Sequence, residues 1–266
     1  MERMTNEINY SEELDKEHAF ALVVAAGEIQ LQSGAEITRV EETMNHMAKA
    51  LKLDSLETYV IANGIFATAE GTEHMQRAGM RHISTGDTDL RKIEEVNTLS
   101  RQLEQGIINM EQAWTRIEEI RKLGDYPAPM LIAAYAIGAG CFCYALGGTG
   151  NDAISATFVG LALGMFFHFL KIWQSSKALR TILGSMLVTF LALTFHEFGL
   201  DDNANWVIIG GVIPMIPGVS FTSAIRDLVE NDYVSGLIRM MDVLLTLSCI
   251  VIGVVLIWEL PWFARF

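Results

Sequence analysis

Residues 206–242 read WVIIGGVIPMIPGVSFTSAIRDLVENDYVSGLIRMMD, and this stretch decides the fold. It begins as an apolar run long enough to start crossing a bilayer, and then breaks at Pro214 and at Pro217–Gly218. Each proline lacks an N–H and clashes with the preceding turn, so the carbonyls near Val212 and Ile213 lose their helical partners. Irregular backbone at membrane depth is tolerated only where protein or a water-lined cavity surrounds it. The stretch therefore predicts a broken transmembrane helix that helps to form a substrate site.

Four further apolar stretches accompany this one, against a spanning requirement of about 20 residues with a lower limit near 17. In chain order the five are 130–146, 153–170, 181–195, 204–221 and 237–258. The third is short and contains glycine, and the fourth is the one broken by proline; both features point to discontinuous helices. Gly160 and Gly164 form a G-x-x-x-G pattern, which indicates either close helix packing or a chance spacing. We predict an α-helical membrane protein with five transmembrane helices, one of them broken by Pro and Gly.

Charge divides the chain near residue 126. Residues 1–126 carry 23 of the 32 acidic and 13 of the 19 basic residues, and a mean hydropathy of +0.29 is high for a soluble protein. We therefore predict a cytosolic α+β domain over 1–126 and a five-helix transmembrane domain over 127–266. The net charge of −13 argues against nucleic acid as a partner. The N-terminus shows no apolar signal-peptide region.

The first domain has mixed helix and strand patterns. Residues 17–52 have helical periodicity interrupted at Gly34, which predicts two helices. Residues 56–69 are rich in β-branched and aromatic side chains, so they predict either a strand pair or one long strand bent at Asn63–Gly64. The remaining expected elements are a strand near 80–84, a helix capped within 87–89 and running to about Leu103, and a helix over 108–123.

Lysine and arginine near the span ends predict the orientation. If residues 1–126 are cytosolic, seven basic residues flank the spans on that side and only Arg265 lies on the other. The odd number of spans then places the C-terminus outside, and tryptophans at 206, 258 and 262 fit an interfacial belt.

Charged residues within or beside the spans are candidates for function, because such groups are costly in a membrane. Asp242 lies about one turn inside the fifth span, where it pairs with Arg239 or binds a proton or gates substrate. His196 and Glu197 end the third span, either at the outer interface or as a titratable pair in a proton relay. Asp152 opens the second span, and helix capping explains it.

No enzyme motif is present. A nucleophile and base can be assembled on paper from Ser33, Glu36, His46, His74 and His82. However, Ser33-Gly34-Ala35-Glu36 is not a G-x-S-x-G elbow and no H-E-x-x-H occurs. Arg39 with Glu36, Glu41 and Glu42 is explained as a solvated helix face with local ion pairs. The three cysteines lie in apolar runs without ligand spacing, so we expect buried thiols, no metal and no cofactor.

Two motifs carry a resemblance to a known family. LQSGAEITRVEETMNHMAKALKL (31–53) followed by YVIANGIFAT (59–68) resembles the N-terminal domain of the threonine/serine exporter family. IPMIPGVSFTSAIRDLVENDYVSGLIR (213–239) is similar to the membrane motif of that family. The likeness extends from about residue 18 to 259. The family motif covers Ser33, Gly34, Glu36, Arg39 and Glu41 in the first domain, and Pro217, Gly218, Arg226, Asp227, Asp232, Tyr233, Gly236 and Arg239 in the second.

The resemblance implies an inner-membrane export protein of the short, split type. Full-length members carry a second set of spans, so the implied partner is a separately encoded small membrane subunit. Membrane lipid is a further expected partner, and the chain could also form an oligomer. Split members include a pair implicated in succinate export, and fused members export threonine and serine. Either substrate class is therefore open.

We expect a secondary exporter, because no G-x-x-x-x-G-K-[ST] motif is present. The helix restarting after Gly218 would offer free N–H groups to a substrate carboxylate. The expected substrate-binding residues are Pro214, Pro217, Gly218, Ser220, Ser223, Arg226, Asp227, Arg239 and Asp242. Alternative functions are a membrane-anchored regulator that senses a metabolite and a membrane-anchored hydrolase.

Overall fold

The structure is a computed structural model that describes residues 2–53, 55–70, 76–83, 88–124, 126–171 and 176–260. The chain divides into two units. The first unit comprises Met1–Gly124 with Val219–Met240, and the second comprises Asp125–Gly218 with Met241–Phe266. Residues 219–240, which follow the proline break, therefore fold with the N-terminal part. The sequence-based domain boundary at 126/127 stays a prediction.

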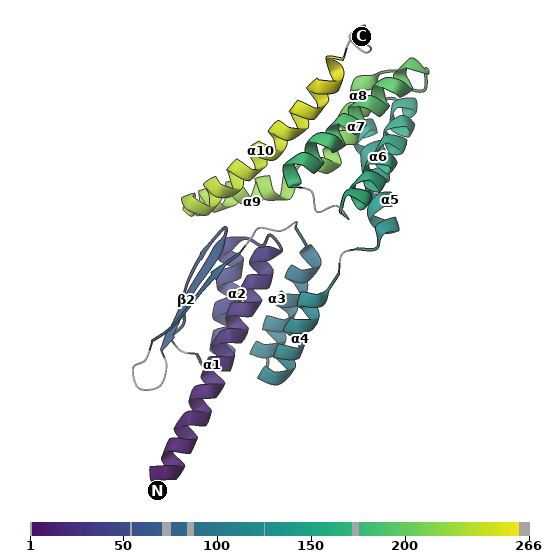
Figure 1. Cartoon of the computed structure of the whole chain (residues 1–266). Coiled ribbons are helices and arrows are strands. Elements are labelled where there is room, and N and C mark those ends of the chain that lie inside the picture. The colour runs from purple at the N-terminus through teal and green to yellow at the C-terminus, as the bar shows by residue number, and fades with distance from the viewer. Residues whose placement is uncertain are drawn as a thin grey trace. The chain divides into compact units, whose positions relative to one another are not determined.

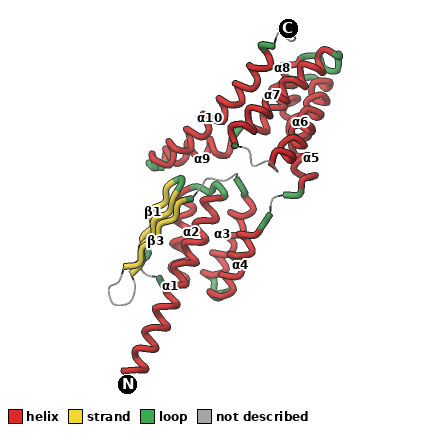
Figure 2. The backbone as a smooth tube through the Cα atoms, in the orientation of Figure 1, coloured by secondary structure: helices red, strands yellow, loops and turns green. Residues whose placement is uncertain are grey.

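In the N-terminal part of the first unit, two helices pack against one face of a small sheet, and two further helices pack on the other side of those helices (Figures 1 and 2). The sheet is antiparallel in the order β1-β2-β3. Val60, Ile65 and Ala67 are buried against the helices, whereas Tyr59 and Phe66 point outward and are exposed. The elements are α1 (Glu2–Gln32), α2 (Ile37–Ala50), β1 (Glu57–Ile61), β2 (Gly64–Glu70), β3 (Gln76–His82), α3 (Leu90–Glu104) and α4 (Met110–Lys122).

Local signals explain where these elements begin and end. Gly34 has φ +80°, a conformation that glycine adopts at little cost, and it separates α1 from α2 as predicted. The β1–β2 hairpin turns at Ala62 and Asn63, which confirms the predicted strand pair. Asp89 caps α3 by accepting N–H bonds from Arg91 and Lys92, while residue 87 lies outside the described part. A capping box formed by Asn109 and Gln112 starts α4.

The second unit is a bundle of apolar helices. It contains α5 (Ala128–Ala145), α6 (Gly150–Lys171), α7 (Lys177–Glu197), α8 (Ala204–Val212), the 3₁₀ turn η2 (Ile213–Met215) and most of α10 (Tyr233–Trp258). Within the described ranges, four helices are long and apolar enough to cross a membrane, or up to five if the bent pair Ala204–Met215 and Gly218–Val229 is one span. The third apolar stretch does not form a discontinuous helix, so that prediction was wrong. Helix α7 has 21 residues, because its polar first and last turns continue the apolar run.

Helices α5 and α6 pack closely through the G-x-x-x-G pattern. A Cβ atom added at Gly160 would lie 2.4 Å from the carbonyl oxygen of Tyr135, and one added at Gly164 would lie 3.0 Å from Cα of Ile132. No larger side chain fits there without moving a backbone. The packing alternative for this pattern is therefore confirmed.

The proline stretch is broken, as predicted. Pro214 lies within η2, Ile216 is extended at φ −69° and ψ 127°, and α9 (Gly218–Val229) begins two residues later. The Ile213 carbonyl loses its α-helical partner but accepts a 3.0 Å hydrogen bond from the Ile216 N–H, so the 3₁₀ turn satisfies it. Helix α9 is amphipathic, with an exposed apolar stripe at Phe221, Ile225 and Val229 and a buried face at Ser223, Ala224 and Asp227.

Candidate functional site

The turn between α1 and α2, residues 33–36, lies against α9 and the first turns of α10. Arg226 of α9 forms an ion pair with Glu36 through its Nη1 atom. Arg239 of α10 donates a hydrogen bond of 2.7 Å from Nη2 to the Ala35 carbonyl. Ser33 is buried, and its carbonyl accepts the N–H of Asp89. Two family-motif segments about 200 residues apart are thus joined by two arginines.

Arg239 also forms the most buried ion pair among the described residues. Its Nε atom lies 3.2 Å from Oδ2 of Asp227, with side-chain exposures of 10% and 2%. The N–H does not point at that oxygen, so attraction between the charges rather than an aligned hydrogen bond holds the pair. Gly236 lies where α9 and α10 meet, since a Cβ added there would lie 2.6 Å from Leu228 Cγ. This glycine allows the approach that brings Arg239 to Asp227.

Glu41 links α2 to the sheet. Its Oε1 atom accepts a 3.1 Å hydrogen bond from the Val60 N–H of β1. Burial raises the pKa of Glu41, the Val60 hydrogen bond opposes that shift, and the nearby negative charge of Asp232 adds to it. Glu36 pairs with Arg226 and Glu41 with a backbone group, so neither forms the local ion pair with Arg39 that we expected.

The break itself is half-buried within the second unit. Pro214 lies next to Gly138 of α5, and Met215 lies near Gly184 of α7. Beyond the break, Ser220 is partly buried and Ser223 is 5% exposed on the inner face of α9. Neighbouring helices therefore cover part of the 3₁₀ turn, whereas Ile216 and Gly218, where the backbone is irregular, are exposed. Contact of Pro217, Gly218 or these serines with a substrate stays a prediction.

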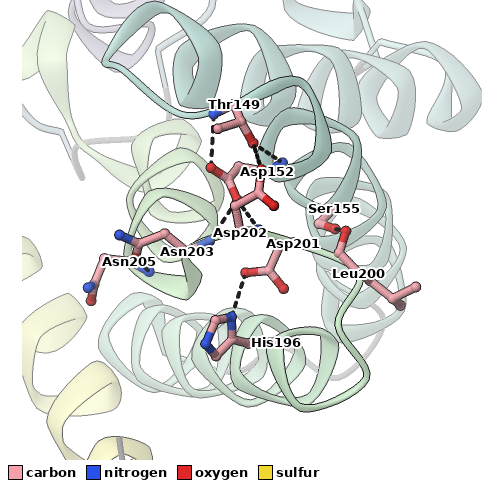
Figure 3. Close-up of polar contacts among 9 residues, drawn as sticks. All are labelled: Thr149, Asp152, Ser155, His196, Leu200, Asp201, Asp202, Asn203 and Asn205. Carbon is pink, nitrogen blue, oxygen red and sulfur yellow. Dashed lines mark hydrogen bonds and ion pairs between the residues drawn. The ribbon is translucent and has the colours of Figure 1, made fainter.

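A second group of residues, linked by polar contacts, joins the ends of α6, α7 and α8 (Figure 3). We name it the α6–α8 cluster: Thr149, Asp152, Ser155, His196, Leu200, Asp201, Asp202, Asn203 and Asn205. Asp152, 1% exposed, accepts hydrogen bonds from the N–H groups of Thr149, Asp202 and Asn203 at 2.8–2.9 Å. Thr149 returns a capping contact to the Asp152 N–H at 3.3 Å. Thr149 and Asp152 thus form a capping box at the start of α6, with Thr149 as the N-cap residue and Asp152 three residues later. The T-x-x-D sequence could have indicated this motif. Asp152 also fixes the 200–203 loop through the N–H groups of Asp202 and Asn203.

His196 pairs with Asp201 rather than with Glu197. Its Nδ1 atom lies 3.3 Å from Oδ2 of Asp201, whose Oδ1 atom is buried without a hydrogen-bond partner in the described structure. Burial raises the pKa of Asp201, and His196 opposes the shift. Glu197 is exposed. Sequence adjacency suggested the wrong carboxylate, because a helix directs neighbouring side chains to different faces.

Asp242 does not pair with Arg239, and that alternative was wrong. Asp242 Oδ2 lies 2.6 Å from Nζ of Lys177 on α7, and both side chains are about half exposed, at 49% and 48%. Arg239 turns to Asp227 and Ala35 instead. Helical spacing permitted the local pair, but tertiary partners from other segments compete successfully for both charges.

The residues considered for hydrolysis are not assembled into one site by any hydrogen bond among the described residues. His46 Nδ1 lies 3.1 Å from Glu104 Oε1, and Ser33 is buried in its turn. His74 lies outside the described residues. No cluster of metal-ligating side chains occurs in the part of the chain that the structure describes.

Comparison with known proteins gives consistent matches. A family model described as putative threonine/serine exporter matches residues 21–260. A probable succinate transporter subunit, YjjP, of Klebsiella aerogenes is 23% identical over 85% of this chain and 87% of its own length. The Escherichia coli protein of that name is 23% identical over 90% and 94%. A probable threonine/serine exporter of Mycobacterium tuberculosis is 22% identical over 88% of this chain but only 45% of its own length. No solved structure matches the chain.

Proposed function

The chain belongs to the threonine/serine exporter family, and on this premise we propose that it is one subunit of a secondary exporter of small carboxylate-bearing metabolites. The substrate is threonine or serine, or a succinate-like dicarboxylate. A small membrane subunit supplies further spans. The relatives are named as transporters or exporters, which agrees with a multi-pass membrane protein that moves solutes.

The observation that carries the proposal is the break between η2 and α9. An apolar helix stops at Met215 and a new one starts at Gly218, in a segment that the family model covers. Interrupted helices with exposed backbone ends are where transporters of several folds bind substrate and coupling ions. The N-terminal end of α9 provides a positive dipole end, suited to a substrate carboxylate.

The 33–36 turn gives the N-terminal part a role in the cycle. It binds α9 through Arg226 and α10 through Arg239. Any movement of α9 at the break must therefore move or release this turn. We propose that the N-terminal part sets the position of α9, and that Arg226 attracts anionic substrate when Glu36 releases it.

The N-terminal part lies in the cytosol and the C-terminus on the opposite side of the inner membrane, in agreement with the distribution of lysine and arginine. Export of a dianion then gains from an inside-negative potential, which contributes about 2.3 kcal/mol per charge per 100 mV. The exposed stripe of Phe221, Ile225 and Val229 is the surface that lipid or the small subunit would cover.

Counterflow in proteoliposomes tests the proposal. Vesicles are prepared with this chain alone and with a candidate small membrane subunit, and uptake of labelled succinate and labelled threonine against an internal pool is measured. We expect counterflow of one substrate class only when both subunits are present. Absence of counterflow for both substrates, with both subunits inserted, would contradict the proposal.

A further inference from the structure

A pocket of about 280 Å³ lies between α2 and α3. This volume suits a small metabolite rather than a nucleotide, since pockets for drug-sized ligands begin at about 300 Å³. Helix α2 contributes four lining residues and α3 the other four. They are Arg39, Glu42, Thr43 and His46, with Asn97, Ser100, Arg101 and Glu104.

The charges in this pocket are incompletely paired. His46 and Glu104 satisfy each other at 3.1 Å. Arg39, Arg101 and Glu42 take part in no ion pair among the described residues, so two guanidinium groups and one carboxylate are available at the pocket. Guanidinium groups bind carboxylates through two parallel hydrogen bonds, and a free carboxylate suits an ammonium group.

Two of the lining residues, Thr43 and Asn97, belong to a buried amide network. Gln30 of α1 is fully buried, and its Nε2 atom donates to Asn97 Oδ1 at 2.7 Å and to Thr43 Oγ1 at 3.2 Å. The Oε1 atom of Gln30 is buried without a hydrogen-bond partner in the described structure. Because the Asn97 oxygen faces Gln30, its amide N–H groups are left for the pocket. A buried amide that binds two lining residues and has an unpaired acceptor oxygen is unusual behind a solvated helix face.

We propose that this pocket binds a small zwitterionic metabolite of the α-amino acid class. Arg39 and Arg101 hold its carboxylate, Glu42 holds its ammonium group, and Asn97 and Ser100 supply further hydrogen bonds. A dicarboxylate is disfavoured, because its second carboxylate would face Glu42 and leave that charge unpaired.

The proposed binding site is also placed to affect the 33–36 turn. Arg39 follows Glu36 by one helical turn at the start of α2, and Glu36 holds Arg226. Ligand held by Arg39 therefore acts on the same helix end that contacts α9. The pocket therefore acts as a regulatory site.

Equilibrium dialysis on the purified full-length chain in detergent tests this, with labelled L-threonine, L-serine, L-aspartate and succinate as probes. We expect saturable binding of at least one amino acid. Arg39→Gln and Arg101→Gln should each weaken that binding about tenfold or more, as for loss of a charge-assisted hydrogen bond. Arg116→Gln is the matched control, because Arg116 pairs with Glu95 and Glu119 outside the pocket, and should bind as the wild type does.

Glu42→Gln separates recognition from general damage to the fold. It should weaken amino acid binding but improve binding of succinate, a change that unfolding cannot produce. Failure of every amino acid to bind, or binding that all three pocket variants leave unchanged, would overturn the pocket proposal. Counterflow measured on the same preparations reports separately on export, so a failure of one proposal does not imply failure of the other.

Discussion

The Oδ2 atom of Asp227 lies 3.2 Å from Nε of Arg239, and the two side chains are buried where α9 meets α10. The same guanidinium group donates to the carbonyl of Ala35, about 200 residues earlier in the chain. Three segments therefore depend on one side chain.

Arg239→Gln should lower the stability of the protein strongly. Removing one partner of a buried ion pair leaves an uncompensated charge, which costs about 3–5 kcal/mol. Arg226→Gln is the matched control; its exposed ion pair with Glu36 is screened by solvent, so little change is expected. Thermal unfolding in detergent measures both. Adding Asp227→Asn to the Arg239→Gln variant should recover part of the loss, and equal effects of the two arginine substitutions would contradict the interpretation.

Pro217→Ala combined with Gly218→Ala should abolish export while leaving membrane insertion intact. The double substitution restores an N–H and removes the flexible residue at the start of α9, which favours a continuous helix in place of the break. Counterflow with the small subunit and protease protection of the inserted chain are the two measurements. Wild-type export by this variant would remove the break from the mechanism.

Asp152→Asn should destabilise the second unit. The Asp152 carboxylate accepts three backbone N–H groups from two segments, and a carboxamide offers only one acceptor oxygen. Each buried donor left without a partner costs about 1–3 kcal/mol. Glu197→Gln, the same type of change at an exposed position near the cluster, should leave the melting temperature unaltered. Similar melting temperatures for the two variants would show that the hydrogen bonds to Asp152 contribute little.

Asp242→Asn should change thermal stability by about 1 kcal/mol or less, because its ion pair with Lys177 is half exposed. Exchanging the two charges, Lys177→Asp with Asp242→Lys, should preserve export if the pair only holds α7 to α10. If Asp242 instead binds a proton during transport, the variant with exchanged charges should lose the pH dependence of export. Counterflow across a range of pH decides between these outcomes.

Glu41 should make stability depend on pH. Burial raises its pKa from an ordinary value of 4.5, so the folded state prefers the protonated acid. The stability that this preference contributes is fully present below about pH 4.5 and is lost as pH rises through the raised pKa. Glu41→Gln keeps an acceptor for the Val60 N–H without ionising. As pH rises from 4 toward neutrality, the melting temperature of this variant should therefore increase relative to that of the wild type. A constant difference between the two melting temperatures over this pH range would contradict a raised pKa for Glu41.

Local chemistry made much of this protein predictable. Hydropathy over about 20 residues marked the spans, prolines at 214 and 217 marked the break, and Gly34, Asn63 and Asp89 marked the ends of elements in the N-terminal part. Each signal acts within a few residues, through a missing N–H, a positive φ or a capping side chain. The resemblance of the two motifs to the exporter family was likewise confirmed by the match over residues 21–260.

Partners of charged side chains were decided by the tertiary structure alone. Helical spacing suggested Arg239 with Asp242 and adjacency suggested His196 with Glu197, but Arg239 binds Asp227 and Ala35, Asp242 binds Lys177, and His196 binds Asp201. Neighbours along a helix gain only a few tenths of a kcal/mol from pairing, so a partner that folding brings close from another segment can replace them. Spacing along the chain therefore limits which groups can meet locally, whereas the packing of distant segments determines which groups do meet.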